Sequence, residues 1–171
     1  HWNINDEVDG YMPKVWGVFM MPLITLAMFA LFLVLPAIDP LKANIARFRG
    51  AFNLFIVLIV AFMLYIHGLT LAWSLGYTNF KMSTSMLPAM GFLFIFIGFM
   101  LRKAKRNFFI GIRTPWTLSS DYVWDKTHQL GATLFMVSGV LAFIGGIFGG
   151  MTAFWFLFVP MIGSTLFLLV Y

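Results

Sequence analysis

The sequence predicts an all-α fold, a polytopic bundle of transmembrane helices, and three observations support this prediction. The chain is 61% hydrophobic and only 10% charged, whereas soluble domains are about 25% charged. Its apolar residues form five long runs, each near the roughly 20 residues that a helix needs to cross a bilayer. The basic residues lie in short clusters between these runs. Together these features exclude a soluble domain.

The five apolar runs are the predicted spans of a single integral membrane domain covering residues 1–171. By the length that a bilayer requires, we place them at about 13–38, 51–75, 86–101, 130–148 and 151–171. The last two spans are expected to meet in a tight turn at "GGIFGGMT", which contains four glycines: Gly145, Gly146, Gly149 and Gly150. Small residues also recur four apart on the fourth span, which predicts a ridge for close helix packing: Ser138, Ala142, Gly146 and Gly150.

The distribution of basic residues predicts the orientation. Lys and Arg gather in residues 39–50 and 102–127, which are alternate loops on one side of the predicted bundle. Short loops rich in Lys and Arg stay in the cytoplasm. We therefore expect these two loops inside the cell membrane and residues 1–14 outside. A net charge of +5 also occurs in nucleic-acid-binding proteins, but clusters between apolar runs favour cytoplasmic loops, so no direct nucleic-acid contact is expected.

The motifs of common enzymes are missing from the sequence. The chain has no cysteine, which excludes disulfides, thiol catalysis and Cys-based metal sites. It has no phosphate-binding loop, no paired-His zinc helix and no serine nucleophile elbow. An enzyme is therefore the less favoured class, and no cofactor is expected.

Residues 107–129 are expected to form a structured cytoplasmic loop. Each charged side chain at the centre of a bilayer costs about 2.5–3.5 kcal/mol, so this polar segment lies outside the lipid. Pro115 disfavours helix at the residue before it. Either Ser119 or Ser120 is expected to cap a new helix that continues into the fourth span.

Within this loop, aromatic and charged residues have expected roles. Trp116 and Trp124 are expected to be interfacial anchors. Arg113 is expected to form an ion pair with Asp121 across the proline turn, which would fix the shape of the loop.

Asp121, Asp125 and His128 lie at positions i, i+4 and i+7 of one helical face. Such a trio could ligate a metal or act as acid and base. The favoured interpretation is simpler: a carboxylate at the helix start, a solvated carboxylate and an interfacial histidine.

Two further histidines are candidate functional residues. His67 lies in the second span, where polar residues are functional hypotheses by default. The favoured interpretation is a hydrogen bond to a neighbouring helix. An outer cation site shared by His67 and His1 is an alternative.

Three stretches resemble the SdpI family of bacterial and archaeal membrane proteins. "GIRTPWTLSSDYVWDKTH" is similar to the central signature of that family, and with the preceding Asn107 its matching residues are Asn107, Gly111, Ile112, Arg113, Thr114, Pro115, Trp116, Thr117, Leu118, Trp124, Lys126, Thr127 and His128. "HWNINDEVDGYMPK" resembles the outer motif through His1, Asn3 and Asp9, with Asp6 where glycine is usual.

"IDPLKANIARF" resembles the first cytoplasmic loop of the family through Asp39, Pro40, Asn44 and Phe48. Asp39 is also a candidate helix N-cap, with Pro40 at the first helical position. The helix of the second span would then begin inside this loop, lie along the membrane surface and bend into the membrane near Gly50.

The resemblance implies a function. Family members have one more helix before the outer motif, which gives six spans with both ends inside. The namesake protects its cell from a secreted killing peptide and draws a transcriptional repressor to the membrane. The outer motif would then face the peptide toxin, and the cytoplasmic loops would face the repressor.

Two other functions stay open at this point. A small transporter or channel would be lined by polar residues of the spans: Asn53, His67, Ser138 and Thr165. A membrane enzyme would use side chains of the polar loop: Arg113, Asp121, Asp125 and His128.

Overall fold

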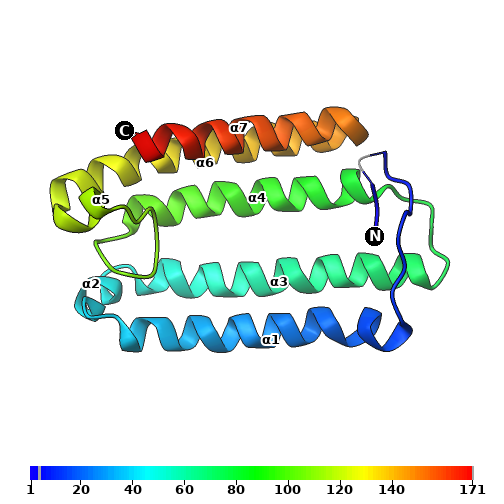
Figure 1. Cartoon of the computed structure of the whole chain (residues 1–171), viewed down its shortest axis with the longest axis horizontal. Helices are drawn as coiled ribbons and strands as arrows, with labels where there is room; N and C mark the ends of the chain where they lie inside the picture. Colours follow the sequence, from blue (N-terminus) through cyan, green and yellow to red (C-terminus); the bar gives the residue numbers. More distant parts are fainter. Residues whose placement is uncertain (4, 171) are drawn as a thin grey trace.

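The computed structural model describes residues 1–3 and 5–170. In this part of the chain there are seven helices (Figure 1): α1 (Lys14–Ile38), α2 (Lys42–Ala46), α3 (Arg49–Ser74), α4 (Met82–Lys103), α5 (Pro115–Ser119), α6 (Asp121–Phe148) and α7 (Gly150–Val170). Among them, α1, α3, α4, α6 and α7 are long and apolar enough to cross a membrane. The predicted all-α bundle with five spans is confirmed.

The long helices run alternately up and down, and Figure 1 shows them in two groups. Helix α1 lies beside α3, while α4 packs against α6 and α6 against α7. The short helices α2 and α5 lie at one end of the bundle. The first residues of the chain cross the opposite end, over the ends of α3 and α4. Polar segments therefore gather at two ends.

Glycines allow α4 and α6 to touch backbone to backbone. A Cβ atom added to Gly91 would lie 2.5 Å from the carbonyl oxygen of Gly139, and one added to Gly139 would lie 2.5 Å from that of Gly91. A Cβ on Gly98 would lie 2.6 Å from the Ala132 oxygen. Because lipid supplies no hydrophobic drive between helices, membrane helices rely on such close packing.

The connection between α6 and α7 lies where the predicted spans leave it, just after Phe148. Gly149 and Gly150 carry the turn, with φ angles of 70° and 53°. Gly145 and Gly146 lie on the buried face of α6 instead. A Cβ on Gly146 would lie 2.7 Å from the ring of Pro88, so the ridge of small residues does receive another helix. The ridge ends there, because Gly150 belongs to α7.

The first loop also differs from the prediction. Helix α2 is a separate helix that starts at Lys42 rather than at Pro40, and α3 starts afresh at Arg49. The reason is packing. Ile45 and Phe48 are both buried in a core shared with α3, the end of α4 and Ile110, which places a break in the chain where a continuous helix was expected.

Candidate functional site at the two polar ends

We call the end of the bundle that holds α2, residues 104–114, α5 and the first turns of α6 the signature end (Figure 1). Asn107 is its fully buried centre. Its Oδ1 accepts hydrogen bonds from the backbone N–H groups of Phe109 (3.0 Å) and Ile110 (2.6 Å). Its Nδ2 donates to the carbonyls of Lys105 (2.8 Å) and Ile110 (2.9 Å). One amide side chain therefore shapes the whole turn.

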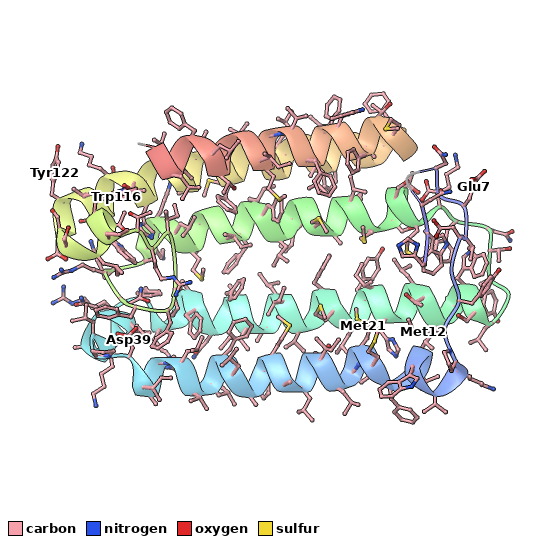
Figure 2. All side chains as sticks on the ribbon, viewed as in Figure 1. Glu7, Met12, Met21, Asp39, Trp116 and Tyr122 are labelled. Carbon is pink, nitrogen blue, oxygen red and sulfur yellow. The ribbon has the colours of Figure 1, made fainter. Side chains whose placement is uncertain are left out.

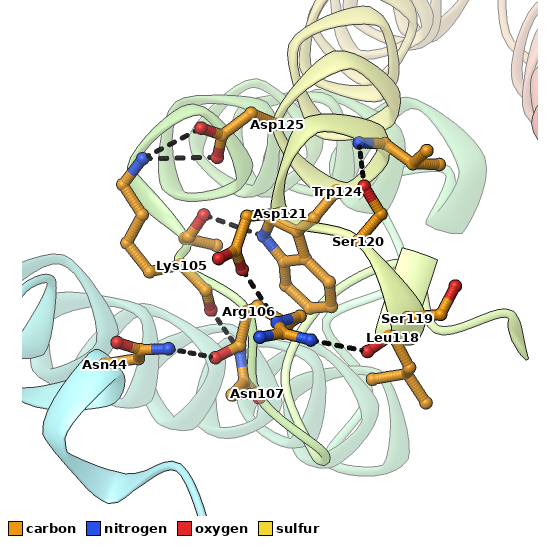
Figure 3. A network of polar contacts seen from close by, with 12 residues as sticks. Asn44, Lys105, Arg106, Asn107, Leu118, Ser119, Ser120, Asp121, Trp124 and Asp125 are labelled. Atoms are coloured by element: carbon orange, nitrogen blue, oxygen red, sulfur yellow. Dashed lines mark hydrogen bonds and ion pairs between the residues drawn. The ribbon is translucent and has the colours of Figure 1, made fainter. Parts of the chain in front are cut away.

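Asp39 and Asn44 join the first loop to the signature loop. Asp39 is 2% exposed, and its carboxylate accepts from the N–H groups of Leu41 (2.6 Å) and Phe108 (2.8 Å). Asn44 Nδ2 donates to the carbonyl of Arg106 (2.9 Å; Figure 3). These contacts unite two segments that the resemblance had singled out separately.

His128 holds the loop against α6. Its Nε2 accepts a hydrogen bond from the N–H of Ile112 (3.0 Å), so the proton of the neutral ring is on Nδ1, which donates to the Trp124 carbonyl (2.8 Å). Gly111, between loop and ring, has a φ of +113°. A Cβ there would lie 2.4 Å from Nε2, so only glycine fits this close approach.

Trp124 is not the interfacial anchor that the sequence predicts. Its side chain is fully buried, and its indole Nε1 donates to the carbonyl of Ala104 (3.0 Å). A tryptophan just before a membrane span can be an interfacial anchor or a buried packing residue, and here the end of α4 covers the side chain of Trp124. Trp116 is 43% exposed, and its role as an interfacial anchor stays a prediction.

Local capping explains the two helices that follow the loop. Thr114 and Thr117 form a reciprocal capping box around α5, with Pro115 as the first helical residue. Thr117 also donates to the Ile112 carbonyl (3.0 Å). Of the two serines considered, Ser120 is the residue that caps α6, accepting from the N–H of Val123 (3.4 Å).

The ion pairs of the signature end differ from the prediction (Figure 3). Asp121 pairs with Arg106 (Nε to Oδ1, 2.7 Å), not with Arg113. Lys105 pairs with Asp125, with its Nζ 3.2 Å from each carboxylate oxygen. Arg113 is exposed and donates from Nη1 to the Phe108 carbonyl (2.9 Å). The turn in the loop directs Arg113 back onto the loop itself.

Asp121, Asp125 and His128 contact separate partners in the structure. Each carboxylate is paired with its own basic residue, and both ring nitrogens of His128 already have partners. Within the described residues no group of three or more His, Cys, Asp or Glu side chains could hold a metal ion. Helical spacing places the three side chains on one face of α6, but each binds a different residue of the preceding loop: Arg106, Lys105 and Ile112.

Residues 1–3 and 5–9 pair as the two arms of a hairpin at the opposite end of the bundle, which we call the hairpin end. Trp2 and Val8 form an antiparallel bridge, and Asn3 Oδ1 accepts from the N–H groups of Asn5 (2.9 Å) and Glu7 (3.0 Å). The side chains of His1 and Asp9 pair across it. The predicted outer motif is thus one folded unit.

Asp6 ties this hairpin to the bundle. Its φ angle is +63°, and no other non-glycine residue that the structure describes has a positive φ. Glycine, which adopts positive φ readily, is usual at this position in the SdpI family that the sequence resembles. Its Oδ1 accepts from the N–H of Ser83 (2.7 Å), and the Ser83 hydroxyl donates to Oδ2. The same hydroxyl accepts from the N–H of Gly150 (3.1 Å). The carboxylate therefore lies at the positive N-terminal ends of α4 and α7.

His67 does not make the expected hydrogen bond through Nδ1, which is buried with no partner in the described residues. The other candidate transporter residues contact different partners. Asn53 accepts from Arg49 (2.9 Å), Thr165 donates to the Met161 carbonyl (2.9 Å) and Ser138 lies 3.5 Å from Ser164. These contacts do not bring Asn53, His67, Ser138 and Thr165 together around one channel.

Sequence reasoning missed Ser83, Lys105 and Arg106. In the sequence Lys105 and Arg106 are two of several loop charges, and Asp121 and Asp125 at the start of the next helix are the signal for their partners. Ser83 belongs to "MSTS" at the start of a predicted span, which is a signal for helix capping.

Comparisons with known proteins find two family models that match parts of the chain. A family model described as the SdpI/YfhL protein family matches residues 103–171, which include the signature loop, α5, α6 and α7. This match covers less than half of the chain. The resemblance seen in the signature is thereby confirmed. A second model, described as a domain of unknown function (DUF1648), matches residues 1–26, which contain the hairpin.

A curated relative is the "Immunity protein SdpI" of Bacillus subtilis (strain 168), which is 27% identical over 138 residues. The alignment covers 80% of this chain but only 63% of the length of that relative. No solved structure matches the chain significantly. With its five apolar helices, this SdpI/YfhL-related chain is a multi-pass membrane protein in contact with the lipid bilayer.

Proposed function

We propose that this protein gives its cell immunity to a secreted killing peptide. The observation that carries the proposal is the similarity to an immunity protein over 80% of the chain. In this proposal residues 1–14 lie outside the cell membrane, and the basic loops 39–50 and 102–127 lie in the cytoplasm.

The hairpin end is the proposed peptide-binding face. His1, Glu7 and Asp9 are exposed there, and Figure 2 shows Glu7 at that end. Trp2 packs edge-to-face on Trp73 of α3, with ring centroids 5.6 Å apart. A folded hairpin presents these side chains without the ordering cost that a flexible segment would have.

Asp6 and Ser83 support a route from the hairpin to the interior. A peptide that displaced the hairpin would remove the carboxylate from the N-terminal ends of α4 and α7. Helix α4 runs from there to the signature end, where the Ala104 carbonyl accepts from Trp124. This path is the proposed link between binding outside and a response inside.

The signature end is the proposed contact surface for a repressor. Arg113, Trp116, Tyr122 and Lys126 are exposed on it, and Figure 2 shows Trp116 and Tyr122 at this end of the molecule. Arg113 uses Nη1 for the loop, which leaves other guanidinium N–H groups for a forked contact that lysine cannot make.

A challenge assay tests the proposal. Cells that are sensitive to the killing peptide of the family would express the full-length gene, and membrane potential would be followed after exposure. We expect protection by the native protein, loss of protection with Arg113→Lys and little change with Lys103→Ala, an exposed lysine outside the loop contacts. No protection by a correctly inserted native protein would contradict immunity, and equal tolerance of both variants would contradict the role of Arg113.

A further inference from the structure

A polar cleft of about 230 Å³ opens at the signature end and has no role in the proposed immunity. Six residues from three segments line it: Asn44, Arg47, Lys105, Arg106, Asp121 and Asp125. Its volume far exceeds the roughly 30 Å³ that one water molecule occupies in the liquid. The cleft therefore has room for a small polar ligand.

The charges of the cleft are unbalanced. Lys105 is paired with Asp125 and Arg106 with Asp121, which leaves the charge of Arg47 uncompensated. The guanidinium of Arg47 makes no hydrogen bond or ion pair with the residues that the structure describes, and the side chain is exposed. A free arginine in a cleft with a surplus of positive charge is suited to an anion.

The neighbouring pairs are able to contribute. The side chains of Lys105 and Asp125 are 43% and 46% exposed, and exposed ion pairs add little net free energy. Lys105 could thus exchange its carboxylate for a ligand oxygen at small cost. Arg106, held by Asp121 and by the Leu118 carbonyl (2.9 Å), is fixed in place (Figure 3). The cations come from two directions, α2 and the segment after α4.

We propose that this cleft binds a phosphate group, as carried by the headgroup of an anionic lipid or by free phosphate. A tetrahedral phosphate presents oxygens in several directions and can meet Arg47 and Lys105 together, whereas a planar carboxylate offers two oxygens in one plane. The cleft lies at the end of four apolar helices, α1, α3, α4 and α6, where lipid headgroups are abundant. Arg47 is the main ligand in this site, and Lys105 the second.

Calorimetric titration of the purified full chain in detergent tests this site. The titrants are short-chain phosphatidylglycerol, inorganic phosphate, an uncharged diacylglycerol of the same chain length and an acidic peptide. We expect phosphatidylglycerol to bind and diacylglycerol not to bind. Loss of a charge-assisted contact in Arg47→Gln should weaken binding about tenfold, while Lys42→Gln, an exposed lysine on α2 outside the cleft, should not weaken it.

The outcomes separate the sources of phosphate. Competition by inorganic phosphate would show that the phosphate group suffices, and binding of the lipid alone would show that its acyl chains contribute. Both support the site. Equal affinity of the native protein and Arg47→Gln, or stronger binding of the acidic peptide than of either phosphate ligand, would overturn it. The immunity proposal does not depend on this result.

Discussion

Trp124 and His128 stack face to face on α6, with ring centroids 3.9 Å apart and planes 16° from parallel. Each also anchors a different segment: the indole binds the Ala104 carbonyl after α4, and the imidazole binds the N–H of Ile112 in the signature loop. One turn of α6 therefore holds the end of α4 and the signature loop together.

Replacing Gly111 with alanine should destabilise the signature end. The new Cβ would meet His128 Nε2 at 2.4 Å, and the φ of +113° is strained for any L side chain. Such strain costs roughly 1–3 kcal/mol. Thermal unfolding in detergent should show a lower midpoint for Gly111→Ala. Gly163→Ala is the matched control, since no described atom lies within 4 Å of its added Cβ, and an equal effect of both variants would contradict the prediction.

His128 should be neutral, with its proton on Nδ1. His128 Nε2 accepts a hydrogen bond from the Ile112 N–H, so a proton on Nε2 would face another donor. Nitrogen-15 NMR of the labelled protein at neutral pH should give a pyridine-type signal for Nε2 and a pyrrole-type signal for Nδ1. The opposite tautomer would mean that the loop does not bind this ring.

Replacing Trp124 with phenylalanine should cost about 1–3 kcal/mol, because the buried Ala104 carbonyl would lose its donor while most of the ring packing is kept. Trp116→Phe, at an exposed ring, should cost much less. Thermal unfolding of the two variants in the same detergent measures the difference. Comparable midpoints would show that the indole hydrogen bond contributes nothing.

Replacing Asp39 with asparagine should weaken the joint between the two loops. The buried carboxylate accepts from Leu41 and Phe108, and the amide would turn one acceptor into a donor facing an N–H group. We expect a loss of about 2 kcal/mol. Asp125→Asn, in an exposed pair with Lys105, should lose less than about 1 kcal/mol. Chemical denaturation of both variants is the measurement, and a larger loss for Asp125→Asn would reverse the ranking.

The proposed orientation is testable by labelling, because the chain has no cysteine. Asn5→Cys should react with an impermeant thiol reagent in intact cells, and Lys103→Cys should react only after the cells are opened. Both positions are exposed in the structure, so lack of reaction reports the membrane and not burial. The reverse pattern would overturn the orientation.

Much of the fold was predictable because spans are a property of composition. A stretch of apolar side chains long enough to cross a bilayer must become a helix, since lipid offers no partner for backbone groups. Capping was equally local: Ser120 and Pro115 act within a few residues of themselves. The glycine turn was predictable in kind and in position, because glycine tolerates the positive φ angles of Gly149 and Gly150. Which helices pack against Gly145 and Gly146, namely α7 and α4, was not predictable.

The candidate site was predictable only as a set of residues. Arg113 and Arg106 are both near Asp121 in sequence, and nothing local decides which one forms the pair. From the sequence Trp124 fits an interfacial anchor, whereas in the structure the end of α4 covers its side chain. In both cases the partner comes from another segment of the chain.

The sequence by itself determined that this is a helical membrane protein, which polar segments lie between its spans and which family they resemble. Each follows from short-range properties, namely hydropathy, capping and a continuous motif. Only the tertiary structure decided that Asp39 binds Phe108, that Asp6 binds Ser83 at the start of α4 while Ser83 binds Gly150 at the start of α7, and that a charged cleft forms around Arg47. The reason is physical: these hydrogen bonds join groups 67 to 77 residues apart, and helix packing alone brings such groups together.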